Sequence, residues 1–235
     1  MTAPRRGLGI FYKEPTPGRV KTRLTPPLRA AEASELYAAL LSDTIQMVNR
    51  ESLLDLVILF DADEPPGWRP AAPADWLHLP QAGVDLGERM EAGLGELLNR
   101  LPGGRACLIG SDAPLLDDQV LESAFHALAE GADMVTSPTP DGGYGLIGVS
   151  RKPPDGLLSG IAWSTRTVLH ETEAAAHRSG WSTARALPCQ DIDTEADLSV
   201  FLTKLKAENS EQQANSAPAT RRCLARLLAA GRLRG

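Results

Sequence analysis

A single aspartate, Asp112, follows a short apolar run in the sequence ACLIGSDAP at residues 106–114. An Asp at the carboxyl end of a strand can hold a divalent cation against a substrate phosphate, because ligands of open α/β sheets bind at that edge. Asp and Ser are also common turn residues, so this stretch alone allows Asp112 to be either a metal ligand or a turn residue. The other charged clusters of the chain must distinguish these two interpretations.

A basic loop follows the first expected strand, where residues 12–24 read YKEPTPGRVKTRL. Its cations are Lys13, Arg19, Lys21 and Arg23. Lys supplies a mobile point charge and Arg a bidentate fork, so this loop, with its small Gly18, is suited to bind a di- or triphosphate. Only Lys21 and Thr22 match the Walker A motif GxxxxGK[ST], so a P-loop NTPase is not predicted. The alternative is a solvated basic loop.

Four acids occur within residues 191–197, which read DIDTEAD. Thr194 and Asp197 resemble a helix N-cap, which leaves Asp191 and Asp193 before the helix. Magnesium commonly takes one or two carboxylates together with phosphate oxygens and waters. Asp112 and Asp193 could therefore share one ion if their loops converge, and a solvated acidic turn is the alternative.

A glycine-rich segment, Asp141-Gly142-Gly143-Tyr144, comes after another apolar run. Asp-Gly-Gly is a good hairpin turn on its own. Glycines also allow a ligand to approach the backbone closely, with Asp141 or Tyr144 contacting its polar groups. Taken alone, the segment favours the hairpin.

Strand-like and helix-like segments alternate along the chain. Apolar runs predict strands at residues 7–11, 54–60, 106–109, 133–137 and 144–149. Apolar residues at helical spacing predict helices at residues 30–50, 85–101, 118–130, 165–178 and 194–206. Such alternation is typical of parallel strands with helices on both faces. The expected fold class is α/β, with one main domain over residues 1–206.

The composition is that of an ordinary globular protein, with 43% hydrophobic and 23% charged residues in a chain of 235. No segment approaches the roughly 18 consecutive apolar residues of a membrane span, and the apolar stretch near the N-terminus is too short for a signal peptide. We therefore expect a cytoplasmic protein without stable membrane insertion. The three cysteines lie far apart without CxxC spacing, which argues against a disulfide framework and a zinc site.

The net charge of −6 conceals an asymmetry, because residues 221–235 carry five arginines and no acid. The acidic body of the chain disfavours nonspecific binding to nucleic acid. Residues 207–220 contain no large apolar residue and are predicted as a flexible linker. The basic tail, residues 221–235, could form an amphipathic helix, but a solvated, frayed end is favoured over a helix that binds a partner or a membrane surface.

Six motifs of the chain occur in the order found in the DUF2064 family. They are KEPTPGRVKTRL (13–24), Gln81 with DLGERM (85–90), GSDAP (110–114), DGGYGLIG (141–148), WST (163–165) and DIDTEADL (191–198). The chain resembles this family over about residues 7–205. Its members are described as glycosyltransferase-like proteins related to phospholactate guanylyltransferase. The resemblance implies the GT-A, or nucleotide-diphospho-sugar transferase, fold, whose sheet is mixed but mostly parallel, with a divalent metal at the nucleotide phosphates.

The resemblance also implies roles for the residues of each motif. The nucleotide side would comprise Lys13, Gly18, Arg19, Lys21, Thr22, Arg23, Gln81 and Asp85. The acceptor side would comprise Asp141, Gly142, Gly143, Tyr144, Trp163, Ser164 and Thr165. Asp112 would be the metal carboxylate and Asp193 a second ligand, for Mg²⁺ or Mn²⁺. Asp85 with Glu88 could instead simply cap a helix.

Two positions depart from the family pattern. Val84 stands where the family often has an additional glycine, and Ala113 stands where a larger polar or acidic residue is common. Neither departure removes a proposed ligand.

The expected mechanism is electrostatic, with Asp112 and Lys21 as catalytic residues. A cation held by Asp112 and Asp193 would neutralise the donor phosphates, and the basic loop would stabilise the leaving group. The donor could be a nucleotide sugar, giving glycosyl transfer to a small acceptor, or a nucleoside triphosphate, giving nucleotidyl transfer to an acceptor phosphate. Glycosyl transfer is the leading expectation, and a non-catalytic nucleotide-binding module is a further alternative.

Overall fold

The computed structural model describes residues 4–51, 53–63, 67–114, 116–207 and 217–233. Its centre is a seven-stranded sheet of order β3-β2-β1-β4-β6-β5-β7. The strands are β1 (Arg6–Tyr12), β2 (Leu56–Asp61), β3 (Leu77–Pro80), β4 (Arg105–Gly110), β5 (Met134–Pro138), β6 (Tyr144–Val149) and β7 (Thr183–Arg185). Strand β6 pairs antiparallel with β4 and β5, and the other neighbouring pairs are parallel. The expected mixed, mostly parallel sheet is confirmed.

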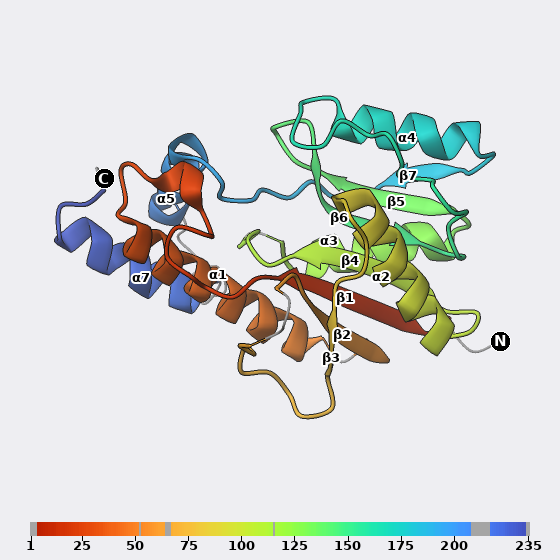
Figure 1. The fold of residues 1–235 in the computed structure, drawn as a ribbon, viewed down its shortest axis with the longest axis horizontal. Coiled ribbons are helices and arrows are strands. Elements are labelled where there is room, and N and C mark those ends of the chain that lie inside the picture. The colour runs from red at the N-terminus through yellow and green to blue at the C-terminus, as the bar shows by residue number, and fades with distance from the viewer. Residues whose placement is uncertain (1–3, 52, 64–66, 115, 208–216, 234–235) are drawn as a thin grey trace.

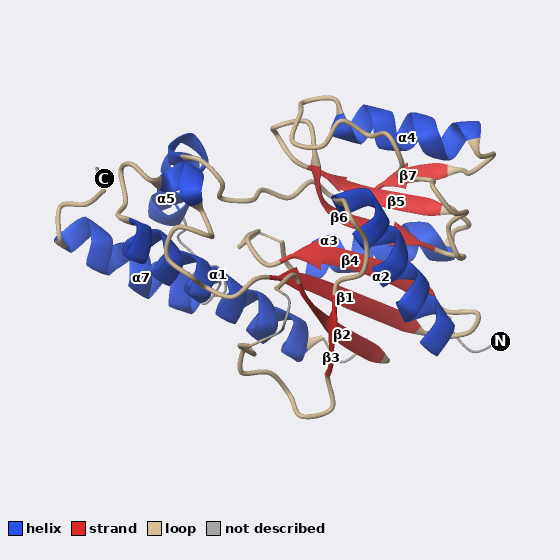
Figure 2. Cartoon of the chain, in the orientation of Figure 1, coloured by secondary structure: helices blue, strands red, loops and turns tan. Residues whose placement is uncertain are grey.

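Helices cover both faces of this sheet, as Figure 2 shows. They are α1 (Ala30–Arg50), α2 (Leu86–Arg100), α3 (Asp118–Ala129), α4 (Val168–Arg178), α5 (Glu195–Ala207) and α7 (Pro218–Ala229), with a 3₁₀ turn η1 (Thr22–Leu24). One buried cluster joins α1 and α3 to the sheet, and another joins α2 and α4 to its opposite face. Burial of these apolar faces, at about 25 cal/mol per Å², is the main force that holds the layers together.

The predicted helices and strands occur close to their expected bounds. The helix over residues 30–50 and the strand over residues 144–149 have the bounds expected from the sequence, and the others differ by up to three residues at either end. The sequence interpretation missed β3 and β7, which have four and three residues. Strands this short are at the lower limit of ordinary strand length, so they show no clear alternation of apolar and polar residues.

A third buried cluster lies beyond the carboxyl end of β1, where α5, α7 and the beginning of α1 gather (Figure 1). It includes Leu24 of η1, Ile192 of the segment before α5, and Phe201 of α5. Leu24 is the last residue of the basic loop, and Ile192 lies between Asp191 and Asp193. This third cluster therefore anchors two of the segments that were predicted to carry the site.

The C-terminal segment corrects one expectation from the sequence. Residues 218–229 form α7, which packs on α1 and buries Cys223, Leu224 and Leu227, so a solvated, frayed end is wrong for them. The carboxylate of Asp43 in α1 accepts hydrogen bonds from the backbone N–H groups of Ala219 and Thr220 at 2.9 and 2.7 Å. The arginine content of the segment suggested a solvated end, but the cap from α1 and the three buried side chains hold the helix against the protein. Most of the predicted linker, residues 208–216, lies outside the described residues.

None of the described helices combines sufficient length with sufficient hydrophobicity to span a bilayer.

Leu224→Ala tests whether α7 belongs to the cooperative fold. Leu224 is 1% exposed, so its truncation should lower the free energy of unfolding by about 2–5 kcal/mol, measured by urea denaturation. Leu187→Ala is the matched control, because Leu187 is 48% exposed and its truncation should change the value by less than about 0.5 kcal/mol. Equal stability of the two variants would show that α7 contributes nothing to the fold.

Candidate functional site

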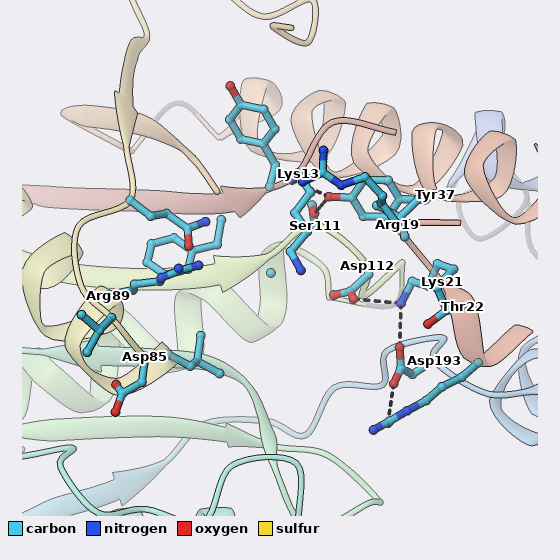
Figure 3. Close-up of a pocket in the computed structure, with 18 residues that line it drawn as sticks. Lys13, Arg19, Lys21, Thr22, Tyr37, Asp85, Arg89, Ser111, Asp112 and Asp193 are labelled. Carbon is cyan, nitrogen blue, oxygen red and sulfur yellow. Dashed lines mark hydrogen bonds and ion pairs between the residues drawn. The ribbon is translucent and has the colours of Figure 1, made fainter. Parts of the chain in front are cut away.

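A cavity of about 570 Å³ carries many of the predicted site residues. It opens beyond the carboxyl ends of β1 and β4, the edge at which α/β sheets bind ligands. Nine residues predicted from the sequence line it: Lys13, Arg19, Lys21, Thr22, Arg23, Gln81, Asp85, Asp112 and Asp193. Figure 3 shows Asp112 between Lys13 and Lys21, with Asp193 facing Lys21. The structure thus brings three separate motifs of the sequence into one cavity.

Lys21 lies at the centre of an ion-pair cluster. Its Nζ is 2.8 Å from Asp112 Oδ2 and 3.4 Å from Asp193 Oδ1, and Arg23 pairs with the other Asp193 oxygen at 2.8 Å. The Lys21 side chain is 3% exposed, whereas those of Asp112 and Asp193 are 35% and 38% exposed. Burial alone lowers the pKa of Lys21, but the carboxylates around it outweigh that effect and the net direction is upward. The ammonium group is therefore charged in the folded protein.

Backbone contacts hold the loops of this cluster together. The N–H of Ile192 donates to the carbonyl oxygen of Asp112 at 3.1 Å, which joins the acidic segment to the end of β4. On the other side, Lys21 has a left-handed conformation with φ 47°, and its carbonyl accepts from Leu24 N–H at 3.0 Å. Because Leu24 and Ile192 are both buried in the third cluster, the loops converge by apolar packing as well as by charge.

The donor chemistry of Asp112 and Asp193 fits a hard divalent cation. Oxygens from two different loops converge on one cation, the Lys21 ammonium, and carboxylate oxygens are the ligands that Mg²⁺ prefers. Asp191 adds to the local negative charge, and its pKa rises to about 6 because of burial and, next, the charges of Asp112 and Asp141. Among the described residues, no group of three or more His, Cys, Asp or Glu side chains is arranged to hold a metal by itself.

Tyr37 and Ser111 were not identified from the sequence. The Tyr37 hydroxyl lies 2.8 Å from Ser111 Oγ and accepts the backbone N–H of Lys13 at 2.9 Å. Both side chains line the cavity, and both residues are buried. Tyr37 thus links α1, the basic loop and the residue next to Asp112. Its position within an amphipathic helix pattern gave no signal for this role.

Gln81 and Asp85 each make a hydrogen bond to the backbone with their side chains. Gln81 Nε2 donates to the carbonyl oxygen of Phe60 at 3.1 Å. Asp85 accepts the backbone N–H of Glu88 at 2.9 Å and is the N-cap of α2, as its spacing to Glu88 suggested. Arg89, one turn further along α2, also lines the cavity and was not predicted.

The predicted acceptor-side residues do not line this cavity, nor does Gly18. Asp141 accepts from Thr139 Oγ1 at 2.5 Å and from Gly143 N–H at 3.0 Å, within the turn that joins β5 to β6. The hairpin favoured by the sequence is thus present. Tyr144 accepts a hydrogen bond from Thr172 Oγ1 at 3.4 Å.

The segment Trp163, Ser164 and Thr165 is held in a loop before α4. Trp163 packs against the α2–α4 cluster, Ser164 has a φ of 64°, and Thr165 Oγ1 donates to the carbonyl oxygen of Ala162 at 2.7 Å. These contacts are structural, so a substrate role for the segment stays a prediction.

The mostly parallel sheet, with antiparallel β6 and a charged cavity at its strand ends, is the arrangement expected of a GT-A-like fold. A family model described as "Uncharacterized protein conserved in bacteria (DUF2064)" matches residues 44–165, about half of the chain. The chain therefore belongs to the DUF2064 family. No curated protein sequence matches it.

Solved structures give the same fold. A protein of Desulfovibrio desulfuricans G20, provisionally named a nucleotide-diphospho-sugar transferase, is 26% identical with a TM-score of 0.83, and the match covers 95% of each chain. A CMP:2-keto-3-deoxy-manno-octonic acid synthetase in complex with CTP is 10% identical, with a TM-score of 0.52 over 87% of this chain and 100% of that one. A 4-diphosphocytidyl-2C-methyl-D-erythritol synthase of Anaerococcus prevotii has a TM-score of 0.51 at 10% identity, with the same coverage of both chains. The chain shares the fold of nucleotide-using transferases.

A double-mutant cycle tests the link between Tyr37 and Ser111. Tyr37→Phe should lower the free energy of unfolding by about 1–3 kcal/mol, because it leaves buried polar groups without a partner. Ser111→Ala in the Tyr37→Phe background should cost less than in the wild type, with a coupling energy of at least about 0.5 kcal/mol. Additive effects would show that the two hydroxyls do not interact in solution.

Proposed function

We propose that this protein is a divalent-metal-dependent transferase with a nucleotide donor, which moves a glycosyl group from a nucleotide-diphospho-sugar to a small acceptor. The observation that carries the proposal is the convergence of Asp112 and Asp193 on one cationic group inside a cavity with several further cations. The name of the Desulfovibrio desulfuricans neighbour, which has the same fold over almost its whole length, supports this type of donor.

Asp112 and Asp193 would hold the divalent cation. When bound, such an ion supplies neutralisation of the negative charge on the donor phosphates. Lys21 and Arg23, which now pair with these two carboxylates, would bind phosphate oxygens, Lys as a point charge and Arg as a fork. The N–H donors of Lys21 and Arg23 would then stabilise the charge that develops on the leaving diphosphate, because the fold already positions them.

A second candidate, nucleotidyl transfer from a nucleoside triphosphate, is favoured by the density of cations. Five cationic side chains line the cavity: Lys13, Arg19, Lys21, Arg23 and Arg89. A triphosphate carries more negative charge than the diphosphate of a nucleotide sugar and would engage more of them. In this reaction an acceptor phosphate oxygen bonds to the α-phosphorus while the bond to the β-phosphate breaks, so pyrophosphate leaves.

Titration calorimetry with nucleoside triphosphates and nucleotide sugars, with and without Mg²⁺, tests the proposal directly. We expect at least one nucleotide to bind, and its affinity to increase in the presence of Mg²⁺. Asp112→Asn keeps the shape of the side chain but removes its charge, so it should weaken nucleotide binding in the presence of Mg²⁺ at least about tenfold and abolish Mg²⁺-dependent turnover.

Asp155→Asn is the control for that substitution, because Asp155 is an exposed residue outside the cavity lining. It should bind nucleotide and Mg²⁺ as the wild type does. If no nucleotide binds under any condition, the proposed function is wrong. Binding that is indifferent to Mg²⁺ in both variants would favour a non-catalytic nucleotide-binding module.

The released product distinguishes the two transfer reactions. Glycosyl transfer releases a nucleoside diphosphate, whereas nucleotidyl transfer releases pyrophosphate. With the donor identified by calorimetry and a panel of small acceptors, ³¹P NMR should show the nucleoside diphosphate if the first candidate holds. Accumulation of pyrophosphate would instead support nucleotidyl transfer and exclude glycosyl transfer.

A further inference from the structure

Two of the cations that line the main cavity, Lys13 and Arg89, lie on the other side of Asp112 from Lys21 (Figure 3). A smaller cavity of about 140 Å³ shares Lys13, Arg19 and Arg89 with the main cavity, and these three side chains line both. In Figure 3, Arg89 and Lys21 lie on opposite sides of Asp112, with Lys13 between Arg89 and Asp112. Arg89 therefore lies apart from the Lys21 cluster along the main cavity, and the smaller cavity is lined by the three shared cations together with Glu14 and Asp63.

The contacts of Lys13, Arg19 and Arg89 within the protein leave some of their N–H donors free to bind an anion. Arg19 pairs with Asp63 Oδ1 at 2.8 Å, and the other Asp63 oxygen accepts the backbone N–H of Glu14 at 2.8 Å. Arg89 Nε donates to the carbonyl oxygen of Gly83 at 3.1 Å, which uses one of its five N–H donors and fixes the orientation of the guanidinium group. In the parts of the chain that the structure describes, no carboxylate pairs with Lys13 or Arg89.

Like charges that share one wall repel each other, and an anion between them removes that repulsion. An arginine fork next to a lysine point charge matches the oxygens of a phosphate group. A volume of 140 Å³ corresponds to roughly four or five water molecules at about 30 Å³ each. Such a space accommodates one phosphate group.

We propose that Lys13, Arg19 and Arg89 form a second anion subsite, which binds a phosphate group separately from the phosphates next to Lys21. This inference rests on the proposed function for its place in the reaction. The phosphate group has two sources: the donor nucleotide itself, or a phosphorylated second substrate. Both present the same oxygens to the subsite, and the experiment distinguishes them.

Calorimetry with inorganic phosphate, at low ionic strength and without metal or nucleotide, tests the subsite in the full chain. The wild type should bind phosphate, and Arg89→Gln should weaken that binding at least about tenfold. Arg100→Gln is the matched control, since Arg100 lies on the same helix and pairs with Glu96 at 2.7 Å outside both cavities. It should bind phosphate as the wild type does.

A repeat of the titration at saturating donor nucleotide identifies the source of the phosphate. Phosphate binding that persists assigns the subsite to a second substrate. If the free protein binds phosphate but the nucleotide-saturated protein does not, the subsite is assigned to the donor's own phosphates. Thermal unfolding of each variant confirms that it is folded, and Lys13→Gln, a change at an exposed residue, serves as the second variant if Arg89→Gln does not fold.

Two results would overturn the subsite: no phosphate binding by the wild type, or equal phosphate binding by Arg89→Gln and the wild type. Because the phosphate titration uses neither nucleotide nor metal, its failure is distinct from failure of the proposed function, which is an absence of nucleotide binding.

Discussion

The geometry of the site depends on a single buried ammonium group that two carboxylates share. Moving a charge out of water costs several kcal/mol, and the pairing of Lys21 with Asp112 and Asp193 offsets that cost only because three segments converge there. Each carboxylate remains about a third exposed. The same cluster therefore holds the loops together and presents two acids to the cavity, so a ligand that binds there must replace the contacts of Lys21 with contacts of its own.

Apolar packing supplies the framework for this charged cluster. Leu24 and Ile192 lie beside the charged residues in sequence, and both are buried in the third cluster with Phe201 and Leu224. The burial of such side chains contributes about 1.5–3 kcal/mol each, which is more than an exposed ion pair provides. Helices α5 and α7 therefore support the site, although none of their described side chains lines its cavity.

The sequence predicted those parts of the fold and site that leave a local pattern. The strands before Lys13 and Asp112 are continuous apolar runs, which the sequence shows directly. Because these two strands pair in parallel, the polar residues that follow them lie at the same edge of the sheet. Arg89 and Tyr37 were not predicted as site residues. In an amphipathic helix an Arg is expected to be solvated and a Tyr to be part of the core. Only the tertiary arrangement places them at the cavity, just as only the partner surface of α1 explains why the arginine-rich segment of α7 is packed.

The motifs shared with the family do not all contact the described cavity, and glycine geometry explains part of this. Gly142 has a φ of 91°, and a Cβ there would lie 2.2 Å from the carbonyl oxygen of Arg166. A Cβ on Gly87 would lie 2.6 Å from the carbonyl oxygen of Leu158. Both positions require glycine for packing, whatever ligand binds. The shared motifs of this chain therefore meet two constraints: some of their glycines allow the close approach of loops behind the site, and others of their residues line the cavity.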